Sequence, residues 1–345
     1  RRGPAPSLKA RRKHLDTLHA CLDPEEIVEP SRLTVRFRTV DLPDDLPLSQ
    51  RERAACQALH RLLAADPGLR ALISWEAASP APVPQRFWHR RDPRIDTGML
   101  AQRIFRYMSP DFFAVHSVDA MSPEEEILLL DYTFLCTTSE AMYHIPSYVR
   151  WLEAQDQTPS YLYFKKLLQL LYWQVPADRW ILKTPHHLEW LETLFQVFPD
   201  AKILQIHRDP QKTMPSFCSM IGHLWGAFTD HVDPHEIGRE LSRKLERMVT
   251  RGMEARDRIG EESFYDLSYY DLVDDPLEQI AGIYDFIERP FTPKIRDCIT
   301  AELGKNEKHK HGIHRYHIDD FGLNKVGLER IFAPYRERFN IPHEE

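Results

Sequence analysis

The chain has 345 residues, a formal net charge of −7, and only 13 glycines beside 26 prolines. Neither G-x-G-x-x-G nor G-x-x-x-x-G-K-[ST] occurs in it, which excludes the glycine-built phosphate loops of those two motifs. The acidic balance gives no reason to expect nucleic acid as a partner, and no apolar run approaches the roughly 20 residues of a membrane span.

The five cysteines are far apart and include no C-x-x-C pair. An odd number without pair spacing is typical of a reducing compartment, so we expect a cytoplasmic protein. The basic start, residues 1–30, has no apolar core and is predicted to be a weakly helical lead-in rather than a secretory signal. We expect the rest, residues 31–345, to form a single domain.

The predicted elements begin with a strand at residues 33–40, where apolar and polar side chains alternate. A loop follows at 41–47, because two prolines and three aspartates cannot continue the strand. At Ser49 the pattern S-x-x-E is a capping box, in which the Ser and Glu side chains bond the first free backbone N–H groups of a helix. We therefore expect a helix from Ser49 to about Asp66.

Helical periodicity dominates residues 99–175. A second S-x-x-E pattern begins at Ser122, with Pro123 in the first helical position, and it predicts that a helix starts there. These features indicate a largely helical insertion at residues 77–175.

Strands and helices alternate in the second half, which is the pattern of a parallel sheet. A short apolar run predicts a strand at 180–182, a β-rich run predicts another at 202–206, and a further strand is expected at 263–267. Helices are predicted at 187–198, 236–260, 276–288 and 325–338. Residues 304–322 are basic and rich in turns. The predicted fold class is therefore α/β, a parallel sheet flanked by helices, with the helical insertion and a basic C-terminal loop.

Candidate functional residues follow two predicted strands, and strand ends are where open α/β sheets bind ligands. Lys183, His186 and His187 come after the first strand and place a fixed positive charge beside a titratable base. At most one of the two histidines can point into a given pocket, because neighbours on a helix lie about 100° apart. The structural alternative is a capped helix start with one packed histidine.

Arg208 ends the next strand, and Ser216 lies eight residues later on the following helix. An arginine and a hydroxyl placed in this way can hold a phosphate together with the helix N-terminus. The structural alternative is an ion pair between Arg208 and Asp209 at the surface, beside a capping aspartate.

The basic C-terminal loop carries a cluster of cations, and such clusters often close over a bound anion. Its members are Lys305, Lys308, His309, Lys310, His311, His314 and Arg315. The histidine spacing also suggests a metal site, but no cysteine or carboxylate stands at ligand spacing and the lysines would repel a dication. We expect no metal here, and a merely solvated loop remains the alternative.

Several stretches of the sequence resemble the sulfotransferase superfamily, most closely its large bacterial branch. They are ALHRLLAADPGLRALISWE (58–76), PEEEILLL (123–130), IPSYVRWL (145–152), RWILKTPHHLEWLETLFQVFPDAKILQIHRDPQKTMPSF (179–217) and HGIHRYHIDDFGL (311–323). The resemblance spans most of the chain. It implies a P-loop-like α/β fold that binds the sulfonate donor 3′-phosphoadenosine 5′-phosphosulfate, PAPS.

The resemblance implies a donor site around Arg208 and Ser216, which match the pair that holds the 3′-phosphate of PAPS. Lys310 and Arg315 in the basic loop are further candidates for the same phosphate.

On the acceptor side, the resemblance matches Lys183 to a lysine near the acceptor. It matches His187, or His186, approximately to a histidine that takes the acceptor proton. His116, shortly before the PEEE stretch, is a second candidate for this side of the site.

One stretch departs from the family pattern. The family's loop for the 5′-phosphosulfate has the form G-x-P-R-[ST]-G-T-T and would fall on residues 50–57, which read QRERAACQ and share only Arg53 with it. Three aspartates precede this stretch, and each like-charge contact at about 4 Å costs roughly 4 kcal/mol at an effective dielectric constant of 20. Normal PAPS binding is therefore not expected unless basic residues among the first thirteen fold over this loop.

The leading hypothesis from the sequence is a sulfotransferase-like enzyme of small-molecule or natural-product metabolism that uses no cofactor. It would carry out elimination, cyclisation or rearrangement of a hydrophobic or aromatic substrate, with Lys183 stabilising an oxyanion and His187, His186 or His116 moving protons. The alternatives are PAPS-dependent sulfonation of an alcohol or phenol, and a binding protein without catalysis. A surviving 3′-phosphate site could also hold coenzyme A.

Overall fold

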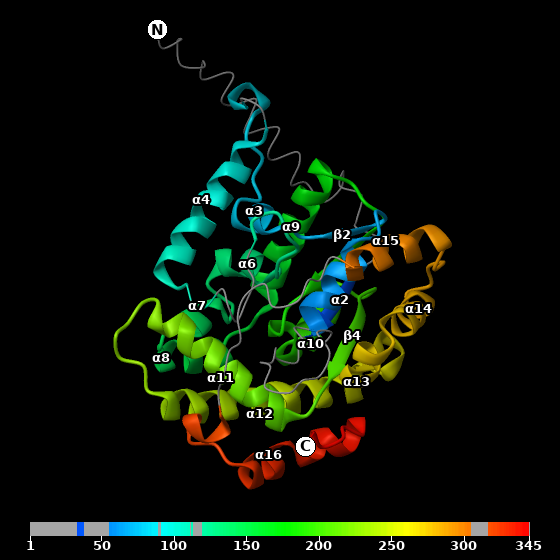
Figure 1. Cartoon of the computed structure of the whole chain (residues 1–345). Coiled ribbons are helices and arrows are strands. Elements are labelled where there is room, and N and C mark those ends of the chain that lie inside the picture. The colour runs from blue at the N-terminus through cyan, green and yellow to red at the C-terminus, as the bar shows by residue number, and fades with distance from the viewer. Residues whose placement is uncertain are drawn as a thin grey trace.

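A parallel sheet forms the centre of the protein in the computed structural model, which describes residues 33–37, 55–88, 91–110, 112, 119–304 and 317–344 (Figure 1). Across these residues the strands are ordered β2-β3-β1-β4-β5 and all pairs are parallel. Their bounds are β1 Leu33–Phe37, β2 Leu69–Ala71, β3 Arg179–Lys183, β4 Lys202–His207 and β5 Phe264–Ser268. The predicted α/β class is confirmed.

Helices connect the strands and cover both faces of the sheet. Before β3 they are α2 Ala55–Ala64, α3 Ser74–Ala78, η1 Gln85–Phe87, α4 Pro93–Met108, α6 Ile127–Leu130, η2 Asp131–Thr133, α7 Thr138–Met142, α8 Pro146–Glu153 and α9 Thr158–Gln174. After β3 they are η3 His186–Glu189, α10 Leu191–Val197, α11 Pro210–Gly226, α12 Pro234–Ile259, η4 Glu261–Ser263, α13 Tyr269–Asp274, α14 Pro276–Phe286, α15 Pro293–Gly304, η5 Ile318–Phe321 and α16 Lys325–Phe339.

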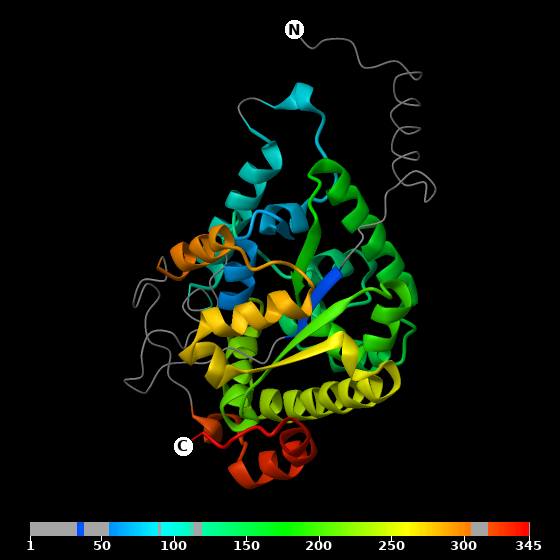
Figure 2. The ribbon, with the colours of Figure 1, turned by 90° about the vertical axis from the view of Figure 1, so that its right-hand side faces the viewer.

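Successive side chains of the central strands point to opposite faces and fill two separate cores. Trp180 and Leu182 of β3 pack with residues of α9, α10 and α12, whereas Ile181 packs with residues of α2, α14 and α15. Figure 2 shows the strands between the green helices on one side and the yellow and orange helices on the other. Both faces of β3 and β4 are buried, so their apolar residues stand in runs, which is why the sequence reveals these two strands.

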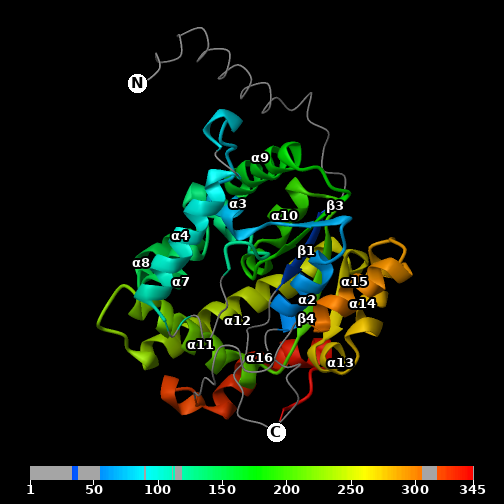
Figure 3. The same cartoon turned by 45° about the horizontal axis from the view of Figure 1, so that its top comes forward.

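The helices between β2 and β3 gather on one side of the molecule. Figure 3 shows α3, α4, α7 and α8 together, away from α13, α14 and α15. This is the stretch in which the sequence predicts a helical insertion. The predicted extent of a single domain, 31–345, stays a prediction.

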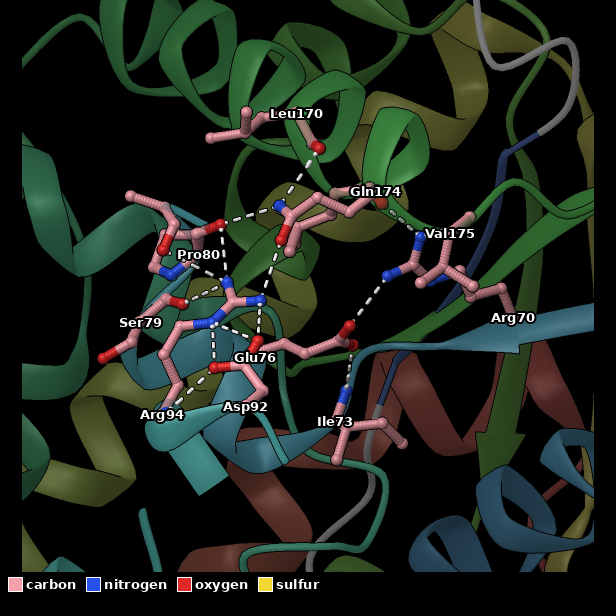
Figure 4. Close-up of polar contacts among 12 residues, drawn as sticks. Arg70, Ile73, Glu76, Ser79, Pro80, Asp92, Arg94, Leu170, Gln174 and Val175 are labelled. Carbon is pink, nitrogen blue, oxygen red and sulfur yellow. Dashed lines mark hydrogen bonds and ion pairs between the residues drawn. The ribbon is translucent and has the colours of Figure 1, made fainter. Parts of the chain in front are cut away.

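A buried polar network joins the beginning of the stretch between β2 and β3 to helix α9 (Figure 4). The guanidinium of Arg94 bonds the carboxylate of Asp92 and the side-chain oxygen of Gln174, at 2.7 and 2.9 Å from its Nη2 atom, and it donates to three successive carbonyl groups at 79–81. Close by, Arg70 is paired with Glu76 at 2.9 Å. Since both arginines are almost fully buried and each has a carboxylate partner, the network specifies one position for this segment.

The second capping box does not start a helix, so that prediction is wrong. Residues 122–124 are extended beside the end of β2, where Pro123 and Ile73 form an isolated antiparallel bridge. The backbone N–H of Glu124 donates to Leu72 at 2.8 Å. This pairing satisfies the backbone groups that a helix would have used, and α6 begins only at Ile127.

The other element predictions differ from the structure mainly at their ends. The helix expected at 187–198 is two elements, η3 and α10, which meet at Trp190. The helix expected from Ser49 is described from Ala55, and its predicted start lies outside the described residues, as do the lead-in and the loop at 41–47.

Candidate active site

A cavity of about 390 Å³ lies at the carboxyl ends of β3 and β4. Its wall is mostly apolar and comes from α11, α12 and the segment 137–149. Side chains on it include Met142, Ile145, Met214, Phe217, Trp225 and Met248. Charged residues interrupt this wall. At the strand ends they are Glu124, Glu125 and Arg208, and elsewhere on the wall they are Glu140, Glu240, Arg243 and Lys244.

The run Glu124–Glu126 crosses the end of β3, and its three carboxylates have different partners. Glu124 and Glu125 line the cavity, whereas the side chain of Glu126 is fully buried behind them. Burial raises the pKa of Glu124, and the charge of Glu125 acts in the same direction. The backbone N–H of Glu125 and the charges of Lys183 and Arg61 oppose that shift without cancelling it. Glu124 is thus a carboxyl group with raised basicity that opens onto an apolar cavity.

Lys183 is 2% exposed and does not stand among the described residues that line the cavity. Its ammonium group is paired with Glu125, and its backbone N–H donates to the Oε2 atom of Glu126 at 2.7 Å. Its positive charge therefore orients Glu125 in this structure. The predicted stabilisation of an oxyanion by Lys183 stays a prediction.

His187 is fully buried and has both ring nitrogens engaged. Nε2 lies 3.1 Å from Oε1 of Glu126, and Nδ1 lies 2.7 Å from the hydroxyl of Tyr161. Because the carboxylate of Glu126 accepts from Nε2, a neutral ring has its lone pair at Nδ1, where it accepts from the hydroxyl of Tyr161. With no ring lone pair left for a substrate proton, this arrangement favours a positioning role over the proton-carrying role that the sequence predicts.

His186 is also fully buried, and it packs against Trp190 with ring centres 4.3 Å apart and the two planes tilted by 35°. Its Nδ1 atom lies 3.3 Å from the hydroxyl oxygen of Thr137. Burial lowers the pKa of His186 well below its usual value, and the nearby His187 and Lys244 lower it further. Neither histidine lines the cavity among the residues that the structure describes.

Arg208 lies at the end of β4 and faces the cavity, but its guanidinium is already bound. Nε and Nη2 donate to the two carboxylate oxygens of Glu344, at 2.6 and 2.8 Å. The hydroxyl of Tyr270 donates to the same carboxylate at 3.0 Å, and the ring of Tyr269 stacks on the guanidinium, 3.7 Å from its central carbon. A guanidinium and a hydroxyl that grip one carboxylate form a donor set that also suits a phosphate.

The neighbours of Arg208 differ from what the sequence suggests. Asp209 caps α11 by accepting from the N–H of Gln211 at 2.9 Å, but its ion-pair partner is Arg336 and not Arg208. Ser216 is buried on α11, and among the described hydrogen bonds none joins its hydroxyl to Arg208.

Three of the predicted site residues, His116, Lys310 and Arg315, lie outside the described residues, as does Arg53. Their roles stay predictions, and so does the expectation of no metal in the basic loop. No helix within the described ranges is long and apolar enough to cross a membrane.

The family model described as the sulfotransferase family matches residues 52–293, which is more than half of the chain and includes both strand ends of the site. The chain belongs to the sulfotransferase family. This result confirms the resemblance found in the sequence.

Two solved sulfotransferases share the fold of this family member over most of its length. Sulfotransferase STF1 from Mycobacterium tuberculosis H37Rv is 29% identical, with a TM-score of 0.73 over 94% of this chain and 80% of its own. STF9 from Mycobacterium avium is 26% identical, with a TM-score of 0.76 over 99% of this chain and 88% of its own. These likenesses confirm the predicted sulfotransferase fold.

Similar curated proteins match this sulfotransferase-family chain over a shorter range. The omega-hydroxy-beta-dihydromenaquinone-9 sulfotransferase Stf3 of Mycobacterium bovis is 30% identical over 154 residues, and the Stf3 protein of Mycobacterium tuberculosis gives the same values. The match covers 41% of this chain and 38% of the relative, so the chain spans well under half the length of these relatives.

Sequence reasoning missed Glu124 and Glu125 because it assigned them to a helix cap. Three consecutive glutamates before a buried apolar run were a usable signal, since one of them had to be buried and paired. No local signal indicated Glu344 or Tyr270, because both join the site through tertiary contacts alone.

Proposed function

We propose that this protein transfers the sulfonate group of PAPS to a hydroxyl group on a hydrophobic acceptor. The observation that carries the proposal is the composition of one cavity wall: the carboxylate of Glu124, with its raised pKa, and the guanidinium of Arg208 border the same apolar cavity. A base near the acceptor and a cation for an anionic donor are the two groups that such a transfer needs.

The donor set around Arg208 fits the 3′-phosphate of PAPS, because it already holds a carboxylate through two guanidinium bonds and a tyrosine hydroxyl. Arg208 and Tyr270 are the residues that would hold this phosphate. The positions matching the family's 5′-phosphosulfate loop lie outside the described residues. When bound, PAPS supplies the sulfonate group.

The chain's own residues prepare the acceptor. Glu124 takes the proton of the hydroxyl group, for which its raised pKa makes it a stronger base than an exposed carboxylate. The ion pair of Lys183 with Glu125 and the buried Glu126 hold the glutamate run in place. The apolar wall binds the body of the acceptor and excludes water, which strengthens the electrostatic contacts inside.

The acceptor class follows from the cavity wall and from a relative. Apolar side chains, among them methionine, leucine, isoleucine and phenylalanine, form most of the wall, which suits an apolar molecule with one hydroxyl group. The full name of Stf3 describes a sulfotransferase whose substrate is a hydroxylated menaquinone. We infer a hydrophobic or aromatic alcohol for this protein as well.

The test is the substitution Glu124→Gln, assayed by transfer of radiolabelled sulfonate from PAPS to a panel of hydrophobic alcohols. We expect kcat to fall by about 10²–10⁴-fold, the usual contribution of a general base, with little change in the acceptor KM. In the wild type, activity should fall as the pH drops through the raised pKa of Glu124, because the base is then protonated.

Glu192→Gln is the matched control, since Glu192 is half exposed on α10 and, among the described residues, forms an ion pair with the half-exposed Arg258. It should transfer sulfonate like the wild type. Full activity in Glu124→Gln would rule out the assigned role of Glu124.

A second candidate is the hypothesis of acid–base chemistry without PAPS, that is, elimination, cyclisation or rearrangement. One observation favours it: Glu344 already fills the donor set of Arg208. Titration calorimetry with PAPS and with adenosine 3′,5′-bisphosphate separates the two candidates. Micromolar binding supports sulfonation, whereas no binding, together with conversion of a substrate in the absence of PAPS, supports the second candidate.

A further inference from the structure

We propose that Glu344 is a built-in competitor for the donor's 3′-phosphate, so that the segment after α16 must release Arg208 before the donor binds. The inference rests on the proposed sulfonation and concerns its regulation. It follows from the contacts of residues 340–344, which we call the tail.

The tail reaches the strand ends because the chain reverses at Asn340. This residue ends α16 in the left-handed conformation, with φ of 50° and ψ of 45°. Ile341 is then buried, and the guanidinium of Arg336 bonds the carbonyl groups of Ile341 and Pro342 at 3.1 and 2.9 Å. In Figure 1, α16 (red) runs below α12 at this end of the molecule.

A buried aspartate joins the tail to the end of β4. Asp209 is fully buried and accepts from the guanidinium of Arg336 at 2.6 Å. Its other carboxylate oxygen accepts from the backbone N–H of Glu344 at 2.8 Å. The main chain of Glu344 is thus fixed beside Arg208 independently of its own side chain.

The side chain of Glu344 then satisfies the donors that a phosphate would use. It takes both Nε and Nη2 of Arg208 and the hydroxyl of Tyr270. Burial and the charge of Glu344 raise the pKa of Tyr270, so this hydroxyl stays a donor at neutral pH. One edge of a guanidinium cannot hold two anions in the same bidentate geometry, so a phosphate and the carboxylate exclude each other.

The competition is intramolecular, which makes it effective. A group tethered beside its site acts at an effective concentration on the order of millimolar or above. A donor must therefore bind Arg208 tightly enough to displace the Glu344 carboxylate. Because the backbone of the tail is held by Asp209 and Arg336, only the Glu344 side chain has to rotate away to free Arg208. Glu344 therefore sets a minimum donor concentration for binding, and no helix or strand has to unfold when it moves.

The experiment compares two nucleotides by titration calorimetry: adenosine 3′,5′-bisphosphate and adenosine 5′-monophosphate, which lacks the 3′-phosphate. We expect Glu344→Gln to bind the bisphosphate at least about tenfold more tightly than the wild type, the effect of removing charged hydrogen bonds from the competing state. Its affinity for the monophosphate should not change.

The matched control is Glu337→Gln, which makes the same charge change on an exposed position of α16 and should bind both nucleotides like the wild type. Circular dichroism melting checks that each variant is folded. Adding Arg208→Ala to Glu344→Gln should remove the preference for the bisphosphate.

The outcomes separate this inference from the proposed function. Equal bisphosphate affinities in the wild type and in Glu344→Gln would overturn the role of Glu344 and leave sulfonation standing. If neither protein binds the bisphosphate, both proposals fall. Tighter binding of both nucleotides to the variant would also overturn the inference, because the effect would then not involve the 3′-phosphate.

Discussion

At the end of β3, the carboxylate of Glu126 is fully buried and bonded to the main chain of Lys183 and to the ring of His187. At the end of β4, the guanidinium of Arg208 is partly exposed, and among the described residues it pairs with the carboxylate of Glu344 and stacks on the ring of Tyr269. The first set of contacts belongs to the core of the protein, and the second lies at the edge of the cavity.

Under the proposed function, this difference matches the different tasks of the two sides of the site. A base must meet its substrate in one fixed geometry, which fits a glutamate run that is supported by the buried side chains of Lys183 and His187. A donor site must exchange one anion for another, so its cation is held by a carboxylate that can be replaced. The following predictions test this contrast.

The largest effect should come from His187→Ala, which removes a buried partner of Glu126 and leaves a cavity. We expect a loss of about 3–5 kcal/mol in the free energy of unfolding, because the missing ring leaves a cavity and the buried carboxylate of Glu126 loses one of its two described partners. Urea unfolding at pH 7 measures it. His231→Ala, at an exposed position, should stay within about 0.5 kcal/mol of the wild type. A loss below about 1 kcal/mol for His187→Ala would remove the contrast between the two sides.

The second prediction concerns how acid lowers the stability of the protein through His186, at the end of β3. The pKa of His186 is depressed in the folded protein, so below about pH 6.5 the unfolded chain takes up a proton that the folded chain does not. Stability is therefore complete above this pH and is lost as the pH falls, by at most about 1.4 kcal/mol per pH unit.

His186→Gln should remove this part of the pH dependence, which urea unfolding at pH 7, 6 and 5 would show as a shallower slope. His231→Gln is the control and should keep the slope of the wild type, because His231 is exposed. Parallel slopes for His186→Gln and the wild type would mean that His186 is not held neutral.

The smallest effect is expected at the turn into the tail. Asn340 has φ of 50°, where an alanine side chain costs roughly 1 kcal/mol and glycine costs nothing sterically. Asn340→Ala should therefore weaken tail docking and raise bisphosphate affinity by at most about fivefold, whereas Asn340→Gly should not. Calorimetry compares the two variants, and identical affinities would show that the turn does not control Arg208.

The sequence predicted the sheet better than the site. The runs at 180–182 and 202–206 lie within one residue of β3 and β4, because strands buried on both faces differ sharply from the turns around them. The strand expected at 263–267 lies within one residue of β5. The capping box at Ser122 failed because pairing with Ile73 supplies hydrogen bonds that no local pattern reveals.

The sequence indicated site residues only where a charged or titratable side chain directly follows a predicted strand. Arg208 was found in this way, and the structure places it on the cavity wall. His187 was found too, but its partner Tyr161 lies on α9, and this distant contact changes what its ring can do. Glu344 was missed because its position depends on a reversal of the chain after α16, many residues from Arg208.

The position of β1 has a consequence for how the protein folds. Leu33 pairs with Trp180 and Thr34 with Lys202, so the central strand depends on partners that lie beyond the whole helical stretch. Such non-local pairing slows folding, because the loop must close before any contact rewards it. The two neighbours of β1 end at Lys183 and at His207, directly before Arg208, so pairing with β1 brings the two sides of the cavity together.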